Sequence, residues 1–69
     1  MFLNEEDYYG PGLVRRREEA GLSRKDMASF ANIPINTLRR YETGEQKPGL
    51  ENLIKIENTL IRVKNFTNK

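Results

Sequence analysis

The chain is 69 residues long and contains neither cysteine nor histidine. This length predicts a single domain, and the composition excludes disulfide bonds, cysteine-based zinc sites and the Ser–His or Cys–His pairs of nucleophilic enzymes. The carboxylates that remain are isolated, so we expect no enzyme activity, no metal and no cofactor.

The formal net charge is +2, but the basic residues are spread unevenly along the chain. Residues 1–11 hold acids and no base, whereas most lysines and arginines lie between residues 12 and 47. A basic segment of this kind can meet nucleic-acid phosphates, and a solvated surface of mixed charge is an equal alternative. No apolar run approaches the roughly 18 residues that span a bilayer, and the first residues do not resemble a signal peptide. We therefore expect a cytoplasmic protein with no membrane partner.

The first expected elements are an arm and a short helix. Residues 1–11 show no clear period and are interpreted as an N-terminal arm whose aromatic residues can rest on the core. Proline suits the first turn of a helix, so Pro11 favours a helix that covers about residues 12–20. Leu13 and Ala20 are its candidates for the core, and the glycine that follows can take the left-handed conformation that ends a helix.

A second helix is expected at about residues 24–31. Ser23, with an acid three residues later, resembles a capping box at its start. Three apolar residues of this segment share one face: Met27, Ala28 and Ala31. Asn32 tolerates the left-handed conformation, and the residue before Pro34 avoids the helical region, so the helix ends there.

A third helix is expected at about residues 34–43, with Leu38 and Tyr41 facing inward and a glycine directly after it. A fourth helix follows over about residues 49–63. Its expected buried stripe consists of Leu50, Leu53, Ile54, Leu60 and Ile61. The alternation of residue types over 61–64 also permits a short strand, and residues 65–69 are interpreted as a C-terminal tail.

The most informative unit is residues 23–44, which reads as helix, tight turn and helix. A small residue, Ala28, lies where the two helices would cross, as a helix-turn-helix requires. An ordinary corner of a helical bundle is the alternative. DNA binding is favoured because the outer face of the second of these helices carries groove-reading residue types: Ile35, Asn36, Arg39 and Arg40. Three residues around it can reach phosphates: Arg24, Thr43 and Lys47.

Two segments, REEAGLS at 17–23 and RRYETGEQKP at 39–48, extend this pattern. Through them the chain resembles the Cro/C1-type helix-turn-helix family of phage repressors and bacterial regulators over about residues 12–60. The resemblance implies an all-α, lambda-repressor-like domain of four helices, which we place at residues 12–64. It also implies sequence-specific binding of duplex DNA as a transcriptional regulator, more often a repressor.

The resemblance further implies roles for individual residues. Arg17 of the first helix would form a structural ion pair with Glu42 near the end of the third, and Arg24 would contact a phosphate. Three positions match the base-reading ones of the family: Ile35 for a thymine methyl, Asn36 for adenine and Arg40 for guanine. Arg39 is a second candidate for a base edge or a phosphate, with a solvated charge as the alternative.

The chain also departs from the family pattern. Pro34 stands where the family often has serine or threonine, Asn32 replaces a frequent glycine, and Arg16 replaces a frequent leucine. The short fifth helix that usually completes the dimer contact has no match after residue 60.

One monomer reads only a few base pairs, so we expect a homodimer on an operator with two half-sites. Apolar residues left outside the core place its interface at the end of the fourth helix: Ile61, Val63 and Phe66. If these residues form a strand, antiparallel strand pairing is the alternative. The alternative function is a protein-binding module, such as an antitoxin or an adaptor. We expect no small-molecule effector, because the sequence shows no evident ligand pocket.

Overall fold

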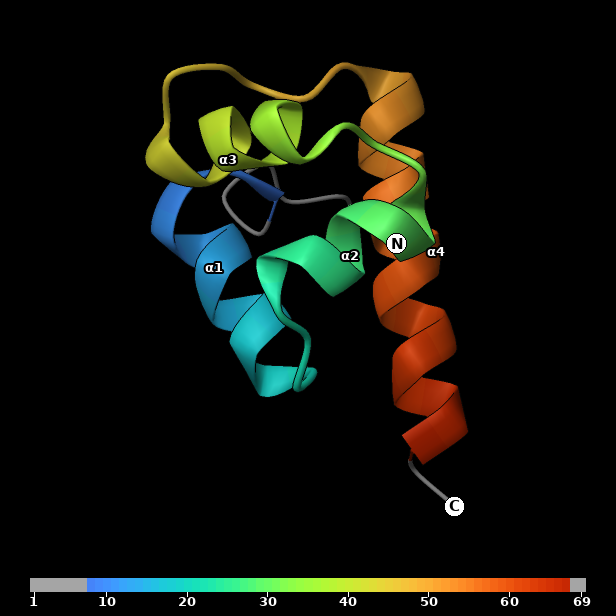
Figure 1. Ribbon diagram of the computed structural model, residues 1–69. Coiled ribbons are helices and arrows are strands. Elements are labelled where there is room, and N and C mark those ends of the chain that lie inside the picture. The colour runs from blue at the N-terminus through green and yellow to red at the C-terminus, as the bar shows by residue number, and fades with distance from the viewer. Residues whose placement is uncertain (1–7, 68–69) are drawn as a thin grey trace.

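The computed structural model describes residues 8–67, and this part of the chain forms four α-helices. The helices are α1 (Gly10–Glu19), α2 (Arg24–Ala31), α3 (Ile35–Thr43) and α4 (Leu50–Thr67). Helix α1 packs on α3, and α2 packs on both α3 and α4. Figure 1 shows α4 as a long rod beside the three shorter helices, with the link from α3 to α4 arching over α3. The predicted all-α class with four helices is confirmed.

Local capping fixes both ends of α2. The Ser23 Oγ accepts a hydrogen bond of 3.0 Å from the backbone N–H of Asp26 at the N-terminus. Asn32 takes the left-handed conformation at the C-terminus, with φ 58 and ψ 48. Both features were expected, and Asn32 begins the turn that leads into α3.

The folded domain begins earlier than predicted. Helix α1 starts at Gly10 instead of about residue 12, so Pro11 lies in the first turn, where its missing N–H needs no partner. Tyr8, which was assigned to the arm, is only 3% exposed and belongs to the core. Residues 1–7 of the predicted arm lie outside the described part of the chain.

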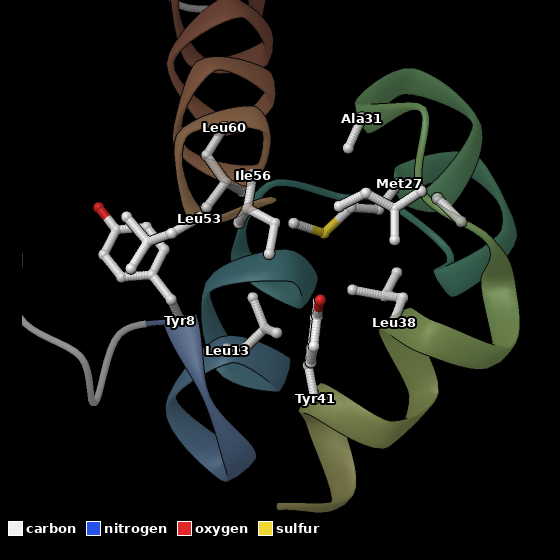
Figure 2. Close-up of a cluster of buried hydrophobic side chains, with 11 residues drawn as sticks. Tyr8, Leu13, Met27, Ala31, Leu38, Tyr41, Leu53, Ile56 and Leu60 are labelled. Carbon is white, nitrogen blue, oxygen red and sulfur yellow. The ribbon is translucent and has the colours of Figure 1, made fainter. Parts of the chain in front are cut away.

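The core contains side chains from all four helices, as Figure 2 shows. Its members are Tyr8, Leu13, Met27, Ala28, Ala31, Ile33, Leu38, Tyr41, Leu53, Ile56 and Leu60. The inward faces predicted for α1, α2 and α3 are therefore confirmed. Ala20 packs against this cluster without being fully buried.

The buried stripe predicted for α4 is wrong at three of its positions. Leu50, Ile54 and Ile61 are 69%, 45% and 43% exposed, whereas Ile56, which was left out, is fully buried. Residues 53, 56 and 60 form one stripe at helical spacing, and residues 50, 54 and 61 form a second stripe at about 100° from the first. The first stripe belongs to the common core, where α2 packs on α4.

The end of α4 also differs from the prediction. The helix continues to Thr67, so the segment 61–64 is not a strand, and the predicted tail is helical up to that residue. The side chains beyond Lys64 lie outside the described residues, and Phe66 is among them.

Arg16 belongs to a polar cluster with Tyr8 and Glu57. The Arg16 guanidinium lies 5.0 Å from the centre of the Tyr8 ring and 3.5 Å from the Glu57 carboxylate. The Tyr8 hydroxyl donates a hydrogen bond to Glu57. Burial raises the pKa of the Tyr8 hydroxyl, and the neighbouring Glu57 carboxylate raises this pKa further. Glu57, which interrupts the apolar pattern of α4, thus pairs with the arginine that replaces a frequent leucine of α1.

Candidate nucleic-acid interface

The turn between α2 and α3 brings these two helices into close contact. Ala28 is 5% exposed at their contact, and its carbonyl accepts a 2.9 Å hydrogen bond from the backbone N–H of Ile33. Pro34 has an extended backbone, with ψ 139, and no side chain caps α3. The small side chain of Ala28 and the left-handed backbone of Asn32 together allow α2 and α3 to cross closely, as a helix-turn-helix requires.

Helix α3 has one buried side and one exposed side. Leu38, Tyr41 and Glu42 are buried. The candidate base-reading residues are all exposed: Ile35, Asn36, Arg39 and Arg40. The last three point away from the buried side, and Ile35 lies in the first turn of the helix. An exposed isoleucine, at 46%, has no role in the core, and it stands beside amide and guanidinium groups that match base edges in a major groove.

Glu42 lies below this surface and binds two arginines. Its side chain is 1% exposed, and its Oε2 atom accepts a 2.7 Å hydrogen bond from the Nε–H of Arg17. The Nε–H of Arg24 donates to the other oxygen, Oε1, at 3.0 Å. A terminal nitrogen of Arg17 also donates to the carbonyl of Leu22, at 2.7 Å. The cluster therefore ties α1, the α1–α2 turn, α2 and α3 together around one buried carboxylate.

The pairing of Arg24 with Glu42 differs from the role expected for Arg24. The expectation for Arg24 was a phosphate contact, and it named no partner within the protein. The cluster combines two guanidinium groups with one carboxylate, so it keeps one net positive charge. The Arg24 side chain is 40% exposed, and a guanidinium has four N–H donors besides the one that Glu42 accepts. Arg24 can therefore present donors at the surface while Glu42 holds its Nε.

The loop after α3 carries the other phosphate candidates. Gly44 ends the helix in the left-handed conformation, at φ 86, which glycine adopts without steric cost. Thr43 is exposed, but its hydroxyl donates to the carbonyl of Arg40 at 3.1 Å, so this proton is already used within α3. Lys47 is exposed, and its ammonium lies 5.5 Å from the centre of the Tyr9 ring. Lys47 is thus the better placed of these two residues to reach a phosphate.

Two of the predicted dimer residues, Ile61 and Val63, do not share one face of α4. Ile61 is exposed, whereas Val63 is half-buried and points about 200° away around the helix. Val63 lines an apolar hollow of about 460 Å³ together with Leu22 and Phe30. Ile61 instead shares the exposed stripe of α4 with Leu50 and Ile54.

Two further properties concern residues 8–67 as a whole. None of their helices is long and apolar enough to cross a membrane. Nor do the aspartate and glutamate residues in this range gather in a group of three or more that could hold a metal ion.

Comparison with known proteins gives one positive result. A family model described as "Helix-turn-helix" matches residues 13–62, which is more than half of the chain and includes all four helices in whole or in part. The comparisons with curated proteins and with solved structures return no match.

Proposed function

The chain belongs to the Cro/C1-type helix-turn-helix family of DNA-binding regulators, and on this premise we propose that it is a repressor that reads an operator with α3. The observation that supports this proposal most strongly is the exposed side of α3, where a side chain suited to a thymine methyl stands among three polar ones suited to base edges. Regulators of this family are typically not enzymes.

In the proposed complex α3 lies in the major groove and the residues beside it position it there. Asn36 reads adenine through a bidentate pair, Arg40 reads guanine, and Ile35 packs on a thymine methyl. Arg24 and Lys47 contact phosphates on either side of the groove, which orients the protein but carries no sequence information.

Binding to a random duplex over a range of salt concentrations tests this proposal. Each phosphate contact releases counterions, so the affinity of the parent protein is expected to fall steeply as salt rises. Arg24→Ala and Lys47→Ala are each expected to reduce the slope of log affinity against log salt by about 1. The control is Lys55→Ala on α4, where the lysine pairs with Glu51 and should leave the slope unchanged. Unchanged slopes for both test variants would remove these residues from the interface.

Arg40→Ala is expected to relax specificity at one base pair and to cost about 1–3 kcal/mol of binding free energy at the preferred site. Arg40→Lys is a matched control, because it keeps the charge and loses the bidentate geometry that recognises guanine. Competition between duplexes that differ at single positions measures both variants. If Arg40→Ala weakens binding to all duplexes equally and Arg40→Lys restores it, Arg40 contacts a phosphate and the base assignment is wrong.

We further propose that the repressor is a homodimer whose contact lies on the exposed stripe of α4. The stripe consists of Leu50, Ile54 and Ile61, which are spaced four and seven residues apart, as in the seam between two packed helices. A symmetric contact would set two α3 helices about 34 Å apart, so that each could read a half-site in successive major grooves.

A second candidate function is a protein-binding module, and the apolar hollow between the α1–α2 turn and α4 favours it. Phe30 is 56% exposed at this hollow, and exposed aromatic residues are typical of protein interfaces. The salt titration separates the two candidates, because an adaptor would show no duplex binding whose salt dependence could be measured.

A further inference from the structure

Tyr9 contacts the loop that follows α3 in two places. Its hydroxyl donates a 2.7 Å hydrogen bond to the carbonyl of Gly44, the residue that ends α3. Its ring lies 5.5 Å from the ammonium of Lys47. Tyr9 precedes α1 directly and lies 35 residues before Gly44 in the sequence, so these contacts join the N-terminal side of the domain to the loop beside α3.

The two contacts hold different parts of this loop. The hydrogen bond fixes the backbone at the point where the chain leaves α3. The ring holds the charged end of Lys47, and Tyr9, Lys47 and Pro48 line one small hollow together with Leu53 of α4. Tyr9 makes no side-chain hydrogen bond that caps α1, so its side chain is directed at the loop and not at its own helix.

We propose that Tyr9 is a positioning residue for the phosphate contact of Lys47, an inference that rests on the proposed function. An exposed lysine loses rotamer freedom when it binds a phosphate, and a contact that already restricts the side chain reduces this loss. An aromatic ring suits this task better than a carboxylate would. It attracts the ammonium through its quadrupole and leaves the positive charge in place for the phosphate.

This role has a consequence that a purely structural role lacks. If Tyr9 acts through Lys47, removing its ring must weaken DNA binding only while Lys47 is present. A cation–π contact at an exposed site corresponds to about a two- to fivefold change in an equilibrium constant. Tyr9→Leu is therefore expected to weaken binding to specific and random duplexes alike by about two- to fivefold, because a phosphate contact carries no sequence information.

The test is a double-mutant cycle on duplex binding. The four proteins are the parent, Tyr9→Leu, Lys47→Ala and the double variant Tyr9→Leu/Lys47→Ala, each measured over a range of salt concentrations. The expected result is a loss for Tyr9→Leu that disappears in the Lys47→Ala background. Tyr9→Phe, which keeps the ring and removes the hydrogen bond to Gly44, is expected to retain most of the affinity. Thermal melts of all variants measure any change in folding separately.

A second measurement checks the contact without DNA. In the free parent protein the ring of Tyr9 should shift the proton NMR signals of the Lys47 side chain upfield, and Tyr9→Leu should abolish this shift. Equal losses in both backgrounds, or no loss in either, would overturn the positioning role while duplex binding by the parent upholds the proposed function. A parent protein that shows the upfield shift but binds no duplex would overturn the proposed function, and the positioning role with it.

Discussion

Glu42→Ala is expected to lower the free energy of unfolding by about 3–5 kcal/mol, because removing one partner of a buried ion pair leaves the other charge uncompensated. Arg17 would lose the carboxylate that accepts its Nε–H at 2.7 Å, and its side chain is only 11% exposed. Small domains have free energies of unfolding near the lower end of about 5–15 kcal/mol. Urea or thermal unfolding should therefore show a variant that is close to unfolded at ambient temperature.

Arg24→Ala is the matched control for this prediction. Arg24 is the more exposed of the two arginines, and Glu42 keeps its contact with Arg17 when Arg24 is removed. The stability of this variant should fall by no more than about 1 kcal/mol, as is typical of exposed ion pairs. If Glu42→Ala unfolds like the parent protein but fails to bind duplex DNA, the role of Glu42 is in binding and not in folding.

The second large effect is expected for Ile61→Glu. Ile61 is 43% exposed, so a carboxylate there stays in water in the monomer but would be buried against a second copy in the proposed dimer. A monomer reads one half-site, and each bidentate base contact of the lost half is worth about 1–3 kcal/mol. With two such contacts in each half-site, the full operator should be bound about 2–6 kcal/mol more weakly.

Sedimentation and operator binding measure this effect together. Ile61→Leu keeps an apolar side chain and should behave like the parent, and Ile54→Glu on the same stripe should act like Ile61→Glu. Melts that resemble those of the parent would show that the added charge leaves the fold intact. A parent chain that stays monomeric at high concentration and binds a single half-site would contradict the dimer.

The parts of the fold that were predicted correctly depend on local chemistry. The cap at Ser23 and the left-handed residue Asn32 act within a few positions of themselves, so the sequence shows the bounds of α2 directly. The buried side of α3 follows from its helical period, and all four candidate base-reading residues are exposed in the structure.

The errors arose where packing between distant segments decides the outcome. Helix α4 has two apolar stripes of similar length, and only its packing against the rest of the core shows that the stripe with Ile56 is the buried one. The Arg24–Glu42 ion pair and the contacts of Tyr9 with the loop after α3 join residues that no period or motif connects. The sequence pattern therefore indicated which residues of α3 are exposed, but not how the arginine and the lysine beside this helix are held.

Selection of bound duplexes from a random pool tests the central proposal most directly, because the pool contains every candidate half-site and no operator has to be chosen beforehand. We predict enrichment of an inverted repeat whose half-sites lie about one helical turn, or about 34 Å, apart. Within each half-site, Arg40→Ala should remove the preference at one guanine–cytosine pair and leave the others intact. A pool that shows no enrichment after selection, at salt concentrations low enough for phosphate contacts to form, would contradict sequence-specific DNA binding by this chain.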